Sequence, residues 1–382
     1  MAQSPKTIFV IGGTGAQGLP VIRGLVQDGG DGGKYIIRIL TRDPASRRAQ
    51  ELAALGPNVE LIAGTFTSEA DLRAGFKGSW GAFVNIDGFA TGEAMEIFWT
   101  MRCYELAGEC GVQVYVHGNL DYGYKLSGYD PLYRCGHYDG KGRVGEWIQL
   151  QRRVAVGKGM RAALFTTGPY MEMALVPETP MAPKLERDGE SGEGEEVLTW
   201  RVPLAPGGGV PHVALDDCGH YVRWLFDNPE RADGMDLAVA IDFLQYHDMA
   251  EAFEKVTGHK ARFVPVDLDT YWREDDFWSK RASFPTGYAA DASSPALMSI
   301  RDNFSGFWRA WSASGHNRGF IRRDFALLDE IHPTRIKTAE EFFRREDEKA
   351  RAEGRGSLWE TVVNPKPLLK IQEDRNLGGR KF

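Results

Sequence analysis

The sequence predicts an α/β fold in which a doubly wound parallel sheet is followed by a smaller, mixed C-terminal lobe. Over the first 168 residues, short runs of β-branched and other apolar residues alternate with helix-length segments. The runs are nearly continuous in apolar character, which is typical of parallel strands covered on both faces. Beyond them, prolines and an acidic, glycine-rich stretch interrupt the alternation. A β–α repeat of this kind predicts right-handed crossovers and a ligand site beyond the carboxyl ends of the strands.

The expected elements of the first domain follow from this alternation. Strands are expected at residues 7–11, 35–41, 59–63, 81–86, 112–117 and 161–166. Helices are expected at residues 16–27, 44–55, 69–76, 93–110 and 139–156. We expect Asp43 to cap the second helix, because Pro44 would then occupy its first position, where a missing N–H does no harm.

The C-terminal lobe is expected over residues 169–337, after a first domain of residues 1–168, and some of its segments could return to that domain. A strand at 197–203 would form a hairpin that turns at Gly207-Gly208-Gly209, and 261–266 would form a further strand. Residues 215–227 and 246–257 have helical patterns, and the acidic residues 185–196 are expected to form a surface loop. Residues 338–382 would be a charged extension: an exposed helix from Thr338 and a loose basic tail with Lys366, Lys370, Arg375, Arg380 and Lys381.

A glycine-rich loop after the first strand gives the strongest functional signal. It reads Gly12-Gly13-Thr14-Gly15-Ala16-Gln17-Gly18, and it opens a helix. In a Rossmann dinucleotide-binding domain, the first glycine of such a loop takes the tight turn and the second lets backbone approach the pyrophosphate. The third lets the helix pack against the strand, and the helix N-terminus offers N–H groups to the phosphates. The position between strand and helix supports this interpretation of an otherwise weak motif.

The end of the second strand predicts NADP(H) as the cofactor. An NAD site usually places a carboxylate there for the ribose 2′-hydroxyl. This chain has Leu40-Thr41-Arg42 instead, with Arg47 and Arg48 close behind. A guanidinium can bind a 2′-phosphate through two hydrogen bonds, so Arg42 is the expected 2′-phosphate ligand.

Composition limits the partners and the compartment. A net charge of −7 argues against a general nucleic-acid surface, and no stretch approaches the roughly 20 apolar residues that span a bilayer. The four cysteines form no CxxC pair and have no histidine at zinc-ligand spacing. We therefore expect no metal site, no membrane or nucleic-acid partner, and a cytoplasmic location.

The chain resembles the NmrA-like family of atypical short-chain dehydrogenases. The resemblance rests on the loop GGTGAQG, the strand end LTRDP and the segments HYDGKGRVGEW and TTGPYMEM. The HYDGKG helix is closely similar to that of the NADPH-sensor proteins of the family. Two later segments, VALDDCGHYVRWLFDNPE and RRDFALLDEIHPTRIKTAEEFF, are similar to fungal members in particular.

The resemblance implies a cofactor site at matching positions. Gly12, Gly13, Thr14, Gly15, Ala16 and Gln17 would hold the pyrophosphate, and Arg42 the 2′-phosphate. Ile86 and Asp87 would line the cofactor after the fourth strand. Lys141 would meet the nicotinamide ribose, and Tyr170, Met171 and Glu172 would flank the nicotinamide. One departure is that members often carry a serine shortly after the fifth strand, where this chain has His117-Gly118-Asn119.

The proton donor is the open question of the site. In the short-chain dehydrogenase scheme, a tyrosine four residues before the lysine donates the proton, and the lysine lowers its pKa. No tyrosine of this chain has a lysine four residues later, and the residue one turn before Lys141 is His137. We therefore take Lys141 and His137 as the candidate catalytic residues, although His137 could instead cap a helix or pack.

Residues 121–138 form an unusually aromatic insertion, with Tyr122, Tyr124, Tyr129, Tyr133 and Tyr138. This insertion could be a packed surface loop. It could equally be a wall of the substrate pocket, where aromatic rings give shape and phenols give hydrogen bonds.

Two functions remain open at this point. The family contains reductases of fungal secondary metabolism, and the aromatic insertion favours such an enzyme. The hypothesis is an NADPH-dependent reductase of a hydrophobic metabolite, which transfers hydride to a C=N, C=C or C=O bond. The family also contains NADPH-binding regulators that bind a protein partner without turnover. The altered proton-transfer residues favour that alternative, which would allow a nuclear location, and the charged extension could supply the partner surface.

Overall fold

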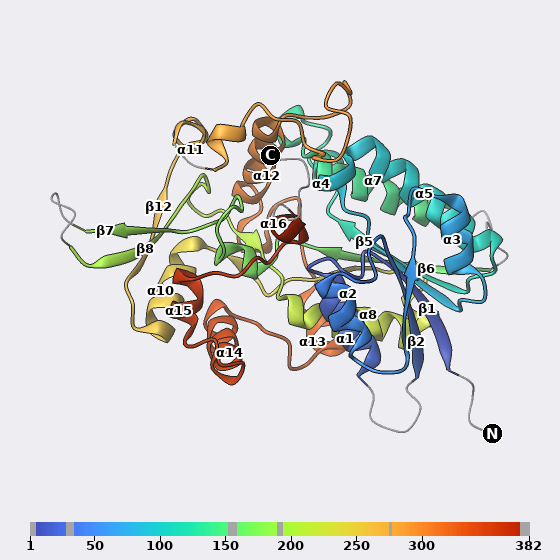
Figure 1. Cartoon of the computed structure of the whole chain (residues 1–382). Helices are drawn as coiled ribbons and strands as arrows, with labels where there is room; N and C mark the ends of the chain where they lie inside the picture. Colours follow the sequence, from blue (N-terminus) through green and yellow to red (C-terminus); the bar gives the residue numbers. More distant parts are fainter. Residues whose placement is uncertain (1–4, 28–33, 152–158, 189–193, 275–276, 375–382) are drawn as a thin grey trace.

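A seven-stranded parallel sheet forms the centre of the larger lobe (Figure 1). The computed structural model describes residues 5–27, 34–151, 159–188, 194–274 and 277–374. The strand order is β10-β6-β5-β4-β1-β2-β3, and every neighbouring pair is parallel. The strands are β1 (Lys6–Ile11), β2 (Tyr35–Thr41), β3 (Val59–Ala63), β4 (Gly81–Val84), β5 (Val114–Leu120), β6 (Arg161–Thr167) and β10 (Asp236–Ala238). The predicted doubly wound fold is confirmed, and its order reverses between β1 and β4.

Helices cover both faces of this sheet (Figure 1). One face carries α1 (Gly18–Val26), α2 (Arg47–Ala53) and α8 (Leu215–Asp227), and the other carries α3 (Glu69–Phe76), α5 (Glu93–Glu109) and α7 (Gly136–Gln151). β1 shows why: Ile8 and Val10 pack into the first layer, whereas Phe9 and Ile11 pack into the second. Successive side chains of a strand point to opposite faces, so an unbroken apolar run supplies two cores.

Several boundaries of the first domain differ from the expectations; α7, for example, begins at Gly136 and not at residue 139. The prediction that Asp43 caps α2 is wrong, because the helix begins at Arg47 after Ser46. The Asp43 carboxylate accepts a hydrogen bond from Ala45 N–H at 2.9 Å instead, so Asp43 makes a turn before the helix. β5 runs on to Leu120, so Gly118 and Asn119 belong to the strand, and β4 ends at Val84. The expected helix at 139–156 is seen as far as Gln151; residues 152–156 lie outside the described part.

The smaller lobe is mixed, as predicted. Its three-stranded sheet has the order β12-β8-β7, with strands β7 (Lys184–Arg187), β8 (Glu196–Val202) and β12 (Ala261–Pro265). β8 pairs antiparallel with β7 and parallel with β12. The expected loop at 185–196 is therefore wrong in its first part, because residues 185–187 belong to β7. The hairpin of β8 is formed with β7, the strand before it, and not with a strand after it. The turn at Gly207–Gly209 leads instead to β9 (Val210–Pro211), which pairs with β11 (Phe243–Leu244).

The remaining elements connect and cover the two lobes. They are α4 (Gly88–Thr91), α6 (Gly123–Leu126), η1 (Pro131–Tyr133), η3 (Met171–Ala174), α9 (Pro229–Ala232), α10 (Tyr246–Thr257), α11 (Leu268–Arg273), η4 (Ser279–Arg281), α12 (Ile300–Ser312), η5 (Gly315–Asn317), α13 (Phe325–Ile331), α14 (Ala339–Ala352), α15 (Leu358–Val363) and α16 (Lys370–Asp374). The chain returns to the larger lobe several times after residue 169: β10 pairs with β6, α8 packs on α1, and Leu328 and Ile331 of α13 are buried in the core beside them. Gly24 and Gly219 allow that helix contact, because a Cβ on Gly24 would lie 2.5 Å from the Gly219 backbone.

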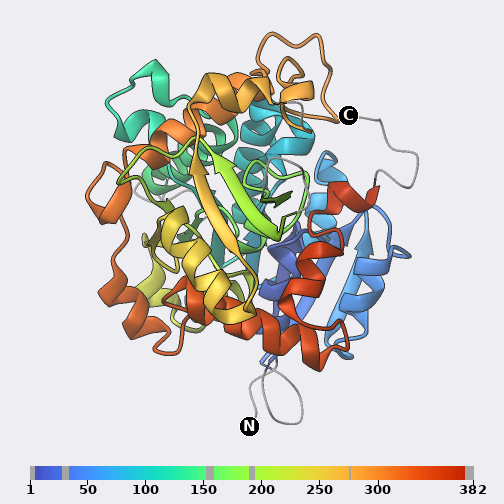
Figure 2. The ribbon, with the colours of Figure 1, turned by 90° about the vertical axis from the view of Figure 1, so that its left-hand side faces the viewer.

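Residues 338–374 of the C-terminal extension are packed against the rest of the chain, and Arg375, Arg380 and Lys381 of the expected basic tail lie outside the described residues. Thr338 caps α14, as expected for the start of that helix, but Phe342 and Phe343 are buried in the core of the smaller lobe. The prediction of an exposed helix therefore holds only for the charged face of α14, because its apolar face is buried. Further along the chain, α16 lies beside α2 of the larger lobe, where Glu373 pairs with Arg48 (Figure 2). Within the described part of the chain, no helix has the length and apolar character needed to cross a membrane.

Candidate cofactor site and active site

Two glycines of the loop after β1 are required by the fold itself. Gly12 has φ of +85°, and a Cβ there would lie 2.1 Å from the carbonyl oxygen of Asn85. A Cβ on Gly18 would lie 2.2 Å from the carbonyl oxygen of Gly12. Gly13 is also confined, because its Cβ would meet Ile22 and Ile39 at 2.8 Å. These contacts let the loop turn tightly between β1 and α1.

Gly15 is different, because the described protein leaves room beside it. A Cβ there would meet only the carbonyl oxygen of Gly12 within 4 Å, at 3.2 Å. The Gly15 N–H donates to that same oxygen at 3.0 Å, which closes the turn. A glycine that the fold does not require, at the exposed edge of a loop that opens a helix, fits a backbone that a pyrophosphate must approach closely.

A chain of amide side chains joins the loop to the centre of the site. The Asn85 amide donates to Gln17 Oε1 at 2.6 Å, and Gln17 Nε2 donates to Thr167 Oγ1 at 3.4 Å. Gln17 is buried, whereas its neighbour Ala16 is half-buried. The ends of β4 and β6 are thereby tied to the glycine loop, and Gln17 contributes a structural link.

The three arginines after β2 have different surroundings. Arg42 is exposed and makes no hydrogen bond or ion pair with any residue that the structure describes. Arg47 and Arg48 both pair with the carboxylate of Glu373, from the far end of the chain. Arg48 is buried and also donates to the carbonyl oxygen of Thr14 at 3.3 Å. Arg42 is therefore the arginine available to a ligand at this strand end.

Lys141 lies at the meeting point of β4, α5 and α7. Its Nζ donates to Asn85 Oδ1 at 2.8 Å and to the carbonyl oxygen of Ile86 at 2.7 Å. It also forms an ion pair with Glu96 Oε1 at 2.8 Å. The ammonium is thus fixed between a carboxylate, an amide and a carbonyl, at the carboxyl end of β4, where a ligand of a doubly wound sheet binds.

Glu96 is a residue that the sequence analysis missed. It is fully buried, and a Cβ on Gly88 would lie 2.1 Å from its carboxylate, so small residues make room for the charge. Burial raises the pKa of Glu96 to about 6, although the Lys141 ammonium opposes that shift. A signal was present, because Glu96 shares the buried face of α5 with Thr100, Cys103 and Ala107 at helical spacing.

His137 stands at the start of α7 in an aromatic cage. Its ring centre is 4.4 Å from that of Phe89 and 5.6 Å from that of Phe304. Its Nδ1 lies 3.0 Å from Asn303 Nδ2 and 3.1 Å from Asn303 Oδ1. Burial lowers the pKa of His137 to about 4, so the imidazole is uncharged at neutral pH.

Asp87 lies beside a tyrosine that sequence spacing could not find. One Asp87 oxygen accepts from Phe89 N–H at 3.0 Å and caps α4, and the other accepts from the Tyr288 hydroxyl at 3.4 Å. The Tyr288 segment is held by backbone bonds to Phe89 and Ala90, each of 2.8 Å. Ile86, before Asp87, is buried and gives only its carbonyl to Lys141.

The segment after β6 separates into packing and capping residues. Met171 is buried in the core of the smaller lobe. Glu172 Oε1 accepts from Leu215 N–H at 2.9 Å, at the start of α8, and burial raises the pKa of Glu172. Tyr170 is half-buried, and burial raises the pKa of its hydroxyl. At the position where relatives often have serine, Asn119 is buried and donates to Thr166 Oγ1 at 2.8 Å.

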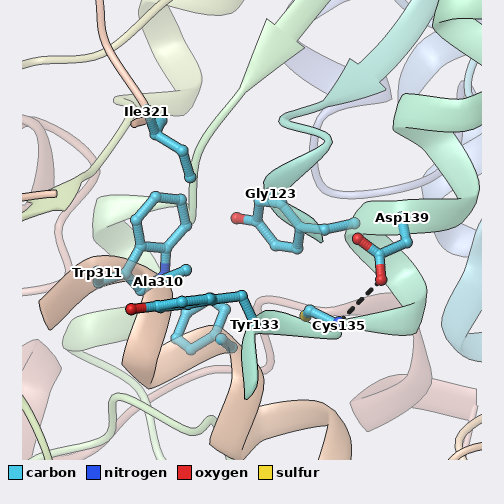
Figure 3. A pocket seen from close by; sticks show the side chains of 9 residues that line it. Gly123, Tyr133, Cys135, Asp139, Ala310, Trp311 and Ile321 are labelled. Atoms are coloured by element: carbon cyan, nitrogen blue, oxygen red, sulfur yellow. Dashed lines mark hydrogen bonds between the residues drawn. The ribbon is translucent and has the colours of Figure 1, made fainter. Parts of the chain in front are cut away.

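The aromatic insertion lines a small cavity, shown in Figure 3. The space it encloses is far smaller than the roughly 300–1,000 Å³ of typical small-molecule pockets. The residues that line it are Gly123, Tyr133, Cys135, Tyr138, Asp139, Phe307, Ala310, Trp311 and Ile321. Other tyrosines of the insertion pack locally: Tyr122 accepts from Arg143 at 2.8 Å, and Tyr124 meets Tyr129 edge to face. Among the described residues, no cluster of histidine, cysteine or carboxylate side chains is arranged for a metal ion.

Comparisons with known proteins agree with this geometry. Residues 4–289 match the NmrA-like family. The NmrA-like family domain-containing oxidoreductase hkm9 of Aspergillus hancockii is 31% identical over 273 residues, covering 70% of this chain and 77% of that protein. The oxidoreductase himF of Aspergillus japonicus, with the same family description, is 30% identical over 276 residues, covering 69% and 78%.

Solved structures share the fold at lower identity. The crystal structure of NmrA, a negative transcriptional regulator, in complex with NADP superposes with a TM-score of 0.66 at 19% identity. That likeness covers 92% of this chain and 98% of the other. The Citrobacter sp. triphenylmethane reductase complexed with NADP(H) gives a TM-score of 0.59 at 14% identity, covering 89% and 99%.

Proposed function

Because this chain belongs to the NmrA-like family, we propose that it is an NADPH-dependent reductase that acts on a hydrophobic small molecule in fungal secondary metabolism. Its similar fungal relatives are named oxidoreductases. The observation that carries the proposal is the fixed ammonium of Lys141, held by Asn85, Ile86 and Glu96 at the switch point of the sheet. A fold-only role would not require a buried cation and carboxylate at that place.

The residues present fit NADP(H). The room beside Gly15 suits the pyrophosphate, and the exposed guanidinium of Arg42 suits the 2′-phosphate. Ile86 and Asp87 would line the cofactor, with Lys141 at the nicotinamide ribose and Tyr170 on the opposite side. Met171 and Glu172 would support that side indirectly, through the packing and capping described above.

Bound NADPH supplies a hydride to an acceptor C=N, C=C or C=O bond, and the protein must position both and deliver a proton. Lys141 holds the ribose and places a positive charge near the acceptor, where it stabilises negative charge that develops during reduction. Glu96 keeps this ammonium in place when its own carboxyl is ionised. His137, uncharged at neutral pH, would act as a neutral hydrogen-bond donor, and the Tyr288 hydroxyl beside Asp87 is a second candidate donor.

The substrate class follows from the rings around His137. Phe89, Phe304 and Phe307 all lie within 6.3 Å of its ring centre. Aromatic faces contribute large apolar contact area to a ligand and few hydrogen bonds, so they favour a hydrophobic, aromatic or alkaloid-like substrate.

The test is a single-turnover measurement of NADPH oxidation with a panel of hydrophobic imines, enones and ketones. The proposal expects that at least one class of acceptor oxidises bound NADPH, with a rate that falls in Lys141→Met at saturating cofactor. An absence of NADPH consumption with every class would contradict a reductase, provided that the protein binds NADPH.

A non-catalytic NADPH sensor that binds a protein partner is the second candidate. The observation in its favour is that the position one turn before Lys141 holds a half-buried, uncharged histidine in place of the tyrosine acid. This alternative expects no turnover, and a partner whose affinity differs between the NADPH-bound and NADP⁺-bound forms.

A further inference from the structure

We propose that the C-terminal segment, residues 368–374, is part of the cofactor site, and that Lys370 is a ligand for a phosphate group of the cofactor. The inference rests on the proposed NADP(H) site, and it adds a residue from the opposite end of the chain. Figures 1 and 2 show the path: after α15, the chain leaves the smaller lobe and places α16 beside α2 of the larger lobe.

The segment is held on the larger lobe by a carboxylate between two arginines. Glu373 pairs with Arg48 through both oxygens, at 2.8 and 3.0 Å, and with Arg47 at 2.5 Å. Arg48 is buried and also donates to the carbonyl oxygen of Leu368 at 2.8 Å. Two-point pairs between a guanidinium and a carboxylate are among the stronger and more directional side-chain contacts. The segment is therefore docked in one orientation.

This docking brings Lys370 to the glycine loop. Its Nζ donates to Thr14 Oγ1 at 3.3 Å, and Thr14 precedes Gly15. The same loop receives Arg48 at the carbonyl oxygen of Thr14, at 3.3 Å. Two cationic groups thus meet a loop whose backbone is shaped for phosphate. A lysine ammonium is a compact point charge that commonly binds phosphate oxygens.

The segment also reaches the smaller lobe. Gln372 Nε2 donates to the carbonyl oxygen of Pro177 at 3.0 Å, and Pro177 follows the Tyr170–Glu172 segment. Gln372 Oε1 accepts from the N–H groups of Leu368 and Leu369 at 2.9 and 3.0 Å, which shapes the turn before α16. The segment therefore links the glycine loop to the side of the site expected to flank the nicotinamide.

Two observations indicate that the C-terminal segment contributes a ligand to the cofactor and does not occupy the cofactor's place. The space beside Gly15 is free of the segment, since a Cβ on Gly15 would meet only Gly12 among the described residues within 4 Å. Arg42, the expected 2′-phosphate ligand, is exposed and forms no hydrogen bond or ion pair with the described residues of the segment. The charge of Glu373 is balanced by Arg47 and Arg48, of which Arg47 also pairs with Glu51, so the ammonium of Lys370 is the cation that the docked segment brings to the loop.

The test compares Lys370→Gln with Lys366→Gln in the full-length protein. Lys366 is an exposed lysine just before this segment and serves as the matched control. Calorimetric titration with NADPH and with NADH is combined with the melting temperature without cofactor, which reports folding. We expect Lys370→Gln to raise the Kd for NADPH about 10-fold or more, as for loss of a charge-assisted hydrogen bond, and Lys366→Gln to leave it within about twofold.

Comparing NADPH with NADH shows which phosphate group Lys370 contacts. An equal loss for NADPH and NADH places Lys370 at the pyrophosphate, and a loss for NADPH alone places it at the 2′-phosphate; either result supports the proposal. Lys370→Arg should restore part of the affinity because it keeps the charge. Unchanged affinity for both cofactors in Lys370→Gln, or tighter binding, overturns the inference. If the parent protein binds neither cofactor, the proposed function fails first.

A second measurement does not depend on a substitution. Acetic anhydride acylates accessible amines, and mass spectrometry measures the extent at each lysine. NADPH should protect Lys370 and leave Lys366 reactive. Equal labelling of Lys370 with and without saturating NADPH would contradict direct contact.

Discussion

The ammonium of Lys141 lies 2.8 Å from the carboxylate of Glu96, a residue with no solvent-exposed surface. An ion pair removed from water holds both groups in place, but a buried carboxylate without its partner is costly. The pair therefore makes the position of the Lys141 ammonium depend on the ionisation of Glu96. That dependence leads to a prediction about pH.

The rate of the chemical step should rise with pH as Glu96 ionises. Its pKa is raised by burial to about 6 from an ordinary value of 4.5, so the carboxyl is largely protonated at pH 5 and ionised at pH 7. Glu96→Gln removes this titration, and single-turnover rates between pH 5 and 8 should then lose the rise centred near pH 6. Glu105→Gln, an exposed glutamate of the same helix, is the control and should keep the parent profile.

The same raised pKa affects stability with the opposite sign. The folded state retains the Glu96 proton more strongly than the unfolded state, so stability falls as pH rises from about 4.5 to about 6. The size of this contribution is about 2 kcal/mol. Urea unfolding at pH 4.5 and pH 6.5 should show a smaller loss in Glu96→Gln than in the parent. An identical loss in both proteins would assign it to other groups.

Gly15 and Gly12 should respond differently to the same substitution. Gly15→Val makes one close contact, with the carbonyl oxygen of Gly12 at 3.2 Å from its Cβ, so the protein should fold and yet fail to bind NADPH. Gly12→Val combines positive φ with a Cβ 2.1 Å from a carbonyl oxygen, so it should destabilise the fold by about 3 kcal/mol or more. Thermal melting by circular dichroism and calorimetric titration separate the two effects. NADPH binding by Gly15→Val would show that the loop does not approach the pyrophosphate.

Arg42 should set the preference for NADPH over NADH. Arg42→Ala should weaken NADPH binding by about 1.5–3 kcal/mol, the usual range for a charge-assisted hydrogen bond, and leave NADH binding nearly unchanged. Calorimetry with both cofactors measures the preference. Equal affinity of the parent protein for NADPH and NADH would exclude this role for Arg42.

Lys141 and His137 should separate catalysis from binding. Lys141→Met should slow single-turnover NADPH oxidation beyond its effect on affinity, because a charge that acts in the transition state appears in the rate. If the uncharged His137 donates a hydrogen bond to the acceptor, His137→Ala should slow the same step without changing the pH profile above about pH 5, since the pKa of His137 is about 4. A silent His137→Ala together with a slow Tyr288→Phe would assign the proton to Tyr288.

Local sequence patterns were sufficient to predict several helices and strands with their bounds. The strands Tyr35–Thr41 and Val59–Ala63 and the helices Leu215–Asp227 and Tyr246–Thr257 have the predicted bounds. Each has an apolar pattern of the correct period and a clear stop at its ends, so neighbouring residues alone specify it. The predicted start of α2 was wrong because an aspartate before a proline is common both at a helix cap and in a turn.

The sequence by itself determined the sheet, the glycine loop and the positions of Arg42 and Lys141, because these depend on short-range periodicity and on motif spacing. Only the tertiary structure decided what surrounds them. Tyr288 reaches Asp87 from 201 residues away, and Lys370 reaches Thr14 from 356 residues away. Such contacts leave no periodic trace in the chain, since they arise when separate elements pack. The burial of Glu96 against Lys141 also required packing, because desolvation raises a pKa only after the surrounding helices have excluded water.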